Sequence, residues 1–171
     1  PTTTPAPTIS YSGVELLVES QETFAAPSST VASSVSLSGS TPVTLDFPVG
    51  AWPAGDTRPL KVSVVNLPSG GAIEASSRSE GRRMAGKVVL FEPSGIAFGA
   101  PVRVKVPYNT SADYGTMSLR VFRYDSATAR WELKPIAAGS TGIDSATGQA
   151  IAETSSFSLY ASLAMPPPTA R

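Results

Sequence analysis

The chain has 171 residues, which suits one domain, and its 13 basic and 13 acidic side chains leave no net charge to attract nucleic acid or an anionic membrane. It contains neither His nor Cys. These absences exclude an imidazole base, a thiolate nucleophile, structural zinc and Ser-His-Asp catalysis, and we expect neither a metal nor another cofactor.

Both ends of the chain are rich in Pro and Thr, which predicts extended linkers around a single domain. Pro lacks the backbone donor that regular structure requires. We therefore expect Pro-rich linkers at residues 1–9 and 165–171 and a folded domain at residues 10–164. Linkers of this composition often carry O-linked sugar and hold a domain away from its neighbours; the alternative is that they are plain disordered termini.

Between these ends, short apolar or alternating runs are separated by Gly, Pro, Asp and Ser, and helix signals are nearly absent. The pattern predicts an all-β fold, an antiparallel β-sandwich of about nine or ten strands. At Phe122 the alternation of one strand shifts, which indicates a bulge or burial on both faces. The expected strands are residues 13–20, 30–37, 43–47, 60–66, 87–91, 102–106, 117–124, 131–136, 150–154 and 157–164.

Two copies of Asp-Ser-Ala-Thr, at residues 125–128 and 144–147, predict hairpin turns, because Asp caps a turn through nearby backbone N–H groups. Neither copy has the alternating carboxylates of a calcium loop. Residues 68–86 are rich in Ser, Gly and Arg and predict a long exposed loop. Its three arginines are candidates for binding an acidic partner or sugar, with a solvated loop as the alternative: Arg78, Arg82 and Arg83.

Asn109-Thr110-Ser111 satisfies the acceptor rule for N-linked glycosylation and directly follows an expected strand. Together with the Thr/Pro-rich ends, it favours a secretory route and an extracellular or cell-surface location. No apolar run is long enough for a membrane-spanning helix. We therefore expect no direct membrane insertion.

No catalytic constellation stands out, because the Asp and Glu residues are scattered among strand ends and turns. Exposed aromatic side chains offer a second hypothesis, a carbohydrate-binding domain in which Trp52 and Tyr114 stack on sugar rings. Trp131 begins an expected strand with Leu133 two residues on, which favours a core position.

The stretch from Lys87 to Tyr108, KVVLFEPSGIAFGAPVRVKVPY, resembles the central signature of zona-occludens/netrin-receptor (ZU-like) β-sandwich domains. In that family, P-x-G-x-x-F precedes a strand of the form P-V-x-V-x-x-P-Y. Further elements follow the family's order at residues 46–51, 121–125, 130–132 and 156–160. The Pro/Thr/Ser-rich ends resemble those of sandwich domains in large extracellular glycoproteins of algae and protists.

Some relatives, and the related GAIN domains of adhesion receptors, cleave themselves before the Ser or Thr of their last strand. The resemblance places this bond between Phe157 and Ser158. The position of the assisting His is Ser156 here, so we favour an intact structural strand over autoproteolysis.

These observations predict a protein that is not an enzyme, a structural or adhesion module of a cell-surface or filament assembly. Its expected partners are other extracellular protein chains, neighbouring domains of the same polypeptide, or glycans, and not nucleic acid. Self-cleavage at Phe157–Ser158 and carbohydrate binding are the alternatives.

Overall fold

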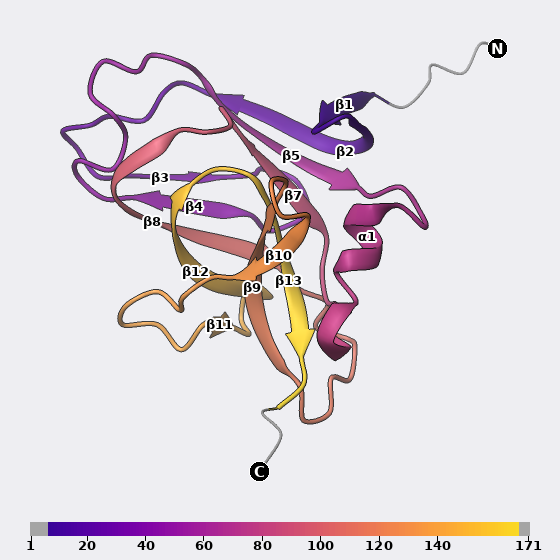
Figure 1. Cartoon of the computed structure of the whole chain (residues 1–171). Helices are drawn as coiled ribbons and strands as arrows, with labels where there is room; N and C mark the ends of the chain where they lie inside the picture. The colour runs from indigo at the N-terminus through magenta and orange to yellow at the C-terminus, as the bar shows by residue number, and fades with distance from the viewer. Residues whose placement is uncertain (1–6, 168–171) are drawn as a thin grey trace.

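The computed structural model describes residues 7–167, which form two antiparallel sheets and one short helix (Figure 1). Sheet A has the order β1-β2-β5-β7-β13-β9-β10, with β6 also paired to β13, and sheet B has the order β11-β12-β8-β4-β3. The strands of sheet A are β1 (Thr8–Tyr11), β2 (Val14–Phe24), β5 (Leu60–Asn66), β6 (Arg83–Met84), β7 (Val88–Glu92), β9 (Ser118–Asp125), β10 (Arg130–Leu133) and β13 (Leu159–Met165). Those of sheet B are β3 (Ser33–Ser36), β4 (Thr44–Phe47), β8 (Ala97–Pro107), β11 (Ile143–Asp144) and β12 (Gln149–Ser156).

The main core lies between the two sheets. It takes alternate residues from strands of sheet A, such as Val62 and Phe91, and from strands of sheet B, such as Leu45 and Val104. Alternation along β8 is clean, with three valines inward and Arg103 and Lys105 partly exposed on the other face. The predicted all-β sandwich is therefore confirmed.

A second core covers the opposite face of sheet A. Val88 and Leu90 of β7, and Leu159 and Leu163 of β13, point to this face and pack with Ile73 of helix α1 (Ala72–Ser76). The central strands of sheet A are thus buried on both faces, which explains why β7 and β13 read as nearly continuous apolar runs.

The shifted alternation at Phe122 has the same cause. Val121 lies in the core between the sheets and Phe122 in the second core, and the pairing of β9 with β13 shows no register shift. Two-sided burial, and not a bulge, is the correct interpretation of this strand.

The ten expected strands are all present, although their ends differ, and the structure adds three short strands, β1, β6 and β11. Strand β1 begins at Thr8, inside the segment expected to be linker, because it pairs with β2. The expected linker residues 1–6 and 168–171 lie outside the described part of the chain.

The prediction of a long exposed loop at residues 68–86 is wrong. The segment forms α1, the 3₁₀ turn η1 (Ser79–Gly81) and β6, and it buries Ile73, Ser77 and Ala85. Its isolated apolar residues escape a pattern search because the helix is too short to show a period. Residues 68–86 therefore cover the second core and are not a solvated loop.

Gly86 lies where this segment crosses β8. A Cβ atom built on Gly86 would lie 2.0 Å from the Pro107 carbonyl oxygen and 2.7 Å from Ser162 Oγ. Ser162 Oγ donates a hydrogen bond to the same carbonyl at 2.7 Å, so neither neighbour can move without losing a buried bond.

We expect Gly86→Ala to lower the free energy of unfolding by about 1–3 kcal/mol or more, the usual cost of overpacking. Gly39→Ala is the matched control, because its Cβ would meet no atom within 4 Å. Urea denaturation of both variants checks this; equal stabilities would contradict it.

Tyr160 is almost fully buried between the sheets, and its hydroxyl donates to the Ser156 carbonyl and contacts Thr154 Oγ1. Burial raises the pKa of Tyr160 to about 12, because the phenolate would lose its hydration. In the unfolded chain a tyrosine titrates near 10. The contribution of protonated Tyr160 to the free energy of unfolding is therefore fully present below about pH 10 and is lost as the pH rises through 12.

Accordingly, the free energy of unfolding should fall between about pH 10 and 12, and fall less in Tyr160→Phe, which has no proton to lose. The two proteins share every other side chain, so the difference between them isolates Tyr160. Urea denaturation at about pH 9 and pH 11 measures the two slopes; parallel slopes would show that Tyr160 is not responsible.

Candidate partner-binding groove

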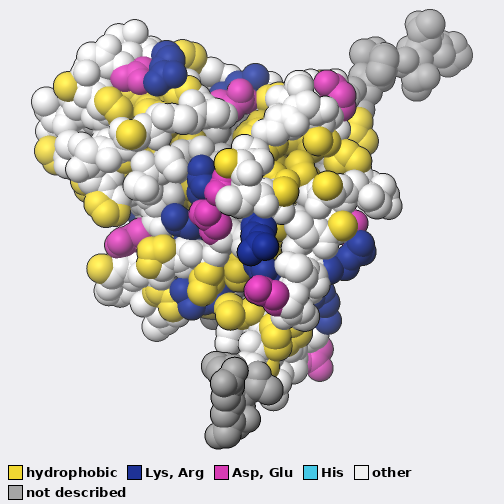
Figure 2. Space-filling view, in the orientation of Figure 1, with side chains coloured by type: hydrophobic (Ala, Val, Ile, Leu, Met, Phe, Trp, Pro, Cys, Tyr) yellow, Lys and Arg dark blue, Asp and Glu magenta, His cyan; other side chains and the backbone are white. Residues whose placement is uncertain are grey.

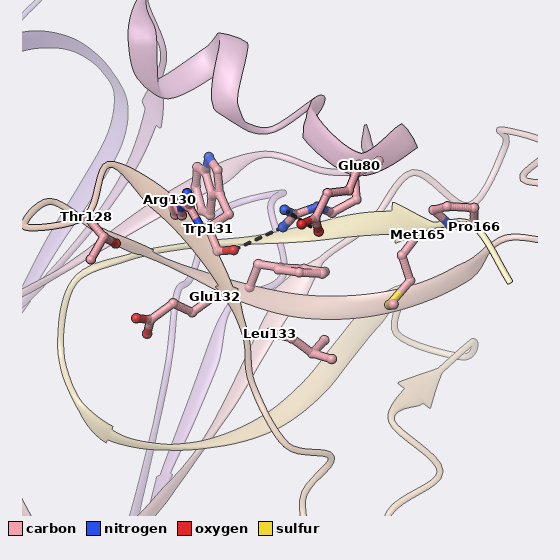
Figure 3. Close-up of a pocket in the computed structure, with 10 residues that line it drawn as sticks. Glu80, Thr128, Arg130, Trp131, Glu132, Leu133, Met165 and Pro166 are labelled. Carbon is pink, nitrogen blue, oxygen red and sulfur yellow. Dashed lines mark hydrogen bonds and ion pairs between the residues drawn. The ribbon is translucent and has the colours of Figure 1, made fainter. Parts of the chain in front are cut away.

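A groove of about 640 Å³ opens beside β10, the last strand of sheet A (Figure 3). One wall is β10 itself. The remaining lining comes from η1 and the residue after it, from β9, from the turn before β10 and from the end of β13. We call it the β10 groove. It is lined by Glu80, Arg82, Phe122, Thr128, Arg130, Trp131, Glu132, Leu133, Met165 and Pro166.

Arg82 forms part of the groove and is held from several sides. Its guanidinium lies over the Phe122 ring at 4.9 Å, and Nη1 donates to the Trp131 carbonyl at 3.0 Å. Nε donates to the Ser79 carbonyl at 3.1 Å. Only 9% of the side chain is exposed, so Arg82 joins η1 to β10 and is a fixed element of the groove.

Trp131 fixes the other wall. Its ring is buried, packs edge-on against Tyr124 at 5.4 Å, and donates from Nε1 to the Ile73 carbonyl of α1 at 3.1 Å. The predicted core position of Trp131 is confirmed. Because α1 and Arg82 both bind this residue, the cover of the second core also sets the position of β10.

The outer edge of β10 has no neighbouring strand in the described chain. Lys134 N–H donates to the Val121 carbonyl at 3.0 Å, so alternation directs the backbone groups of Trp131 and Leu133 away from β9. Arg82 already occupies the Trp131 carbonyl, which leaves the Trp131 N–H and the N–H and carbonyl of Leu133 for an added chain. The Leu133 side chain is 45% exposed. An edge of this kind offers backbone hydrogen bonds and an apolar contact to an added chain.

Charges of both signs surround that apolar contact. Glu80 is 82% exposed, Arg130 is exposed, and Glu132 lies 3.5 Å from Arg123. Acidic and basic side chains also alternate over the face shown in Figure 2, without a large patch of one sign. The groove therefore suits a partner of mixed charge and not a polyanion.

The structure does not bring the three predicted arginines together as one binding cluster. Arg78 pairs with Glu74 of α1 at 2.9 Å, and Arg82 lies in the β10 groove. Arg83 instead lies over the Tyr114 ring at 4.9 Å and donates to the Asp113 carbonyl at 3.0 Å. No pattern in the sequence pointed to Leu133 or Glu80. The order of the strands places Leu133 at the sheet edge, and the folding of η1 places Glu80 beside it.

The two aromatic residues predicted to stack on sugar do not form a platform. Trp52 is only 1% exposed and packs among Phe47, Phe98 and Phe157 in the main core. Tyr114 lies elsewhere, beside Asn109, in a second groove. Stacking of a sugar on Trp52 is therefore ruled out by its burial.

Asn109 is exposed on the turn after β8, as the sequence predicted for a glycosylation acceptor. Its Oδ1 accepts the Ser111 N–H at 3.0 Å, which is an Asx turn.

The bond between Phe157 and Ser158 lies at the corner where the chain passes from β12 in sheet B to β13 in sheet A. Phe157 is buried in the core between the sheets. Ser158 is 4% exposed; its Oγ donates to the Tyr124 carbonyl at 2.8 Å and accepts from the Tyr11 hydroxyl at 2.7 Å. The hydroxyl thus ties three strands together, and it donates its proton to a carbonyl and not to a base.

We expect the chain to run as one intact band on a denaturing gel after prolonged incubation. Ser158→Ala should lower the free energy of unfolding by about 1–3 kcal/mol, because Tyr124 O and the Tyr11 hydroxyl lose a buried partner. Ser126→Ala, at an exposed turn, is the control. Two fragments that disappear in Ser158→Ala would instead establish self-cleavage.

Within residues 7–167, no helix has the length and apolar character needed to cross a membrane. The same residues contain no group of three or more carboxylate side chains placed to hold a metal ion.

The family model for the ZU5 domain matches residues 28–125, from the chain before β3 to the end of β9. No curated protein matches the chain.

Proposed function

Because the chain belongs to the ZU5 domain family, we propose that it is a non-catalytic interaction module of a cell-surface or secreted assembly that binds extended segments of protein partners along β10. ZU5 domains are protein-interaction modules. The predicted resemblance to zona-occludens/netrin-receptor domains is confirmed by the family match.

The observation that carries the proposal is the combination of an open strand edge with an adjoining groove. A segment added to the edge of β10 forms backbone hydrogen bonds with the strand, and its side chains contact Leu133 and Met165 in the groove. Arg82 and Trp131 hold the strand in place, so little conformational entropy is lost when the partner binds.

The chemistry of the chain supports a binding role over a catalytic one. The sequence has no His or Cys, and the two carboxylates of the β10 groove, Glu80 and Glu132, are largely exposed. Both carboxylates are open to water, whereas acid–base catalysis is usually carried out in a site that excludes it.

The extracellular setting is supported by the sequence and by one position in the structure. Both ends of the chain are rich in Pro and Thr, as in large extracellular glycoproteins of algae and protists, and Asn109 of the only sequon is exposed on a turn. In such an assembly the partners are other extracellular chains or neighbouring domains of the same polypeptide.

The proposed binding is tested with peptides that are selected, from a displayed random library, for binding to the chain. We expect Leu133→Asp to weaken the selected peptides at least about tenfold, because a carboxylate must then be desolvated against the apolar contact. Leu17→Asp is the matched control, since Leu17 is a similarly exposed leucine of sheet A, on β2.

Binding is measured by calorimetry, and thermal unfolding confirms that both variants are folded. A library that yields no binder, or binders that are indifferent to Leu133→Asp, would contradict the proposed site.

A further inference from the structure

A second groove, of about 720 Å³, lies beside the turn that follows β8. We call it the Tyr114 groove. It is separate from the β10 groove, and the two share no lining residue. Its lining includes Pro42, Arg83, Lys87, Tyr108, Asn109 and Tyr114.

Asn109 is fixed at this groove by its backbone. Its N–H donates to the Ala85 carbonyl at 2.7 Å, and its carbonyl accepts from the Tyr114 hydroxyl at 2.8 Å. The turn that carries the acceptor asparagine is therefore tied to the segment between β6 and β7 and does not swing freely.

The side chain of Asn109 leaves its acceptor nitrogen available. Oδ1 is held by the Ser111 N–H, whereas Nδ2 has no hydrogen-bond partner among residues 7–167. Nδ2 is the atom that receives an N-linked sugar. A sugar attached there begins at the wall of the Tyr114 groove.

The lining of the groove suits a sugar. Tyr108 and Tyr114 supply aromatic surface and Pro42 an aliphatic one, which match the C–H faces of a pyranose ring. Ser40 and Thr41 add hydroxyl groups at the rim. Both cations already have partners, since Arg83 lies over Tyr114 and Lys87 pairs with Glu19 at 2.5 Å, so a neutral ligand fits better than an anion.

We propose that Asn109 carries an N-linked glycan whose first N-acetylhexosamine units lie in the Tyr114 groove. In the attachment step, Nδ2 forms a bond to C1 of the sugar while the bond from C1 to the diphosphate of a lipid-linked oligosaccharide donor breaks. The proton lost from Nδ2 passes to solvent and balances the charge of the departing diphosphate. The lipid diphosphate is the leaving group. The seated glycan covers the rim between β8 and the segment from β6 to β7 and stabilises the fold. This inference rests on the proposed secretory setting but not on the β10 groove.

The proposed glycan is tested by secreting three proteins from eukaryotic cells. The unchanged chain is compared with Ser111→Ala, which removes the sequon and keeps Asn109, and with Ser111→Ala/Ser126→Asn. The double variant places an Asn-Ala-Thr acceptor on the exposed turn between β9 and β10, away from the Tyr114 groove. Intact mass reports attachment, and thermal unfolding reports the consequence.

We expect a glycan on the unchanged chain and a Tm at least about 4 °C above that of Ser111→Ala. The glycan of the double variant should raise its Tm by less, because residue 126 does not line the Tyr114 groove and its glycan lacks the contacts with Tyr108 and Tyr114. Tyr108→Ala is made both in the glycosylated chain and in Ser111→Ala. It should reduce the difference in Tm between these two proteins, since it removes one wall of the Tyr114 groove.

The possible failures are distinguishable. A secreted chain without added mass overturns the glycan and leaves the secretory setting standing, because a secreted protein need not be glycosylated. The placement of the glycan in the Tyr114 groove is overturned, and its attachment is not, by either of two results. One is a gain in Tm no larger than that from the glycan of Ser126→Asn, and the other is a gain that Tyr108→Ala leaves unchanged. Peptide binding along β10 is measured on protein made in bacteria, without glycan, and is unaffected by either result.

Discussion

Burial of sheet A on both faces is the constraint on which the rest of the structure depends. Toward sheet B, β7 carries Val89 and Phe91 and β13 carries Tyr160. The residues between them point apolar side chains to the other side of sheet A. A sandwich of two sheets alone would leave the second set in water. The segment from α1 to β6 and the β1–β2 hairpin cover it, as the helix beside sheet A shows in Figure 1.

The β10 groove is a consequence of that cover. Ile73 accepts a hydrogen bond from the Trp131 ring, and Arg82 reaches from η1 to the Trp131 carbonyl. Both contacts hold the last strand of sheet A, while its outer edge stays open within the described chain. Arg82, expected in an exposed loop, is therefore part of the framework, and the strand edge with its exposed leucine is the site that we propose for binding.

The corner at Phe157 and Ser158 shows how the same packing governs chemistry. Phe157 belongs to the core between the sheets, and Ser158 joins β13 to β9 and β1 through its hydroxyl. A serine whose hydroxyl donates to one carbonyl and accepts from a tyrosine is a structural link. The resemblance places Ser156 where self-cleaving relatives have an assisting His, and within residues 7–167 the hydroxyl of Ser158 bonds only to Tyr11 and to the Tyr124 carbonyl.

The sequence by itself determined the all-β class, the ten main strands and the exposure of the sequon, because period-two alternation and turn residues act over a few neighbouring positions. The family came from the resemblance of its motifs, above all residues 87–108. Only the tertiary structure decided which strand became an edge, that Trp52 was buried, that residues 68–86 formed a cover, and that Asn109 lay at a groove. Those outcomes depend on contacts between residues far apart in the chain: Trp131 meets Ile73, and Ser158 meets Tyr11. Local patterns contain no information about such pairs, so the sites that they build appear only when the sheets are assembled.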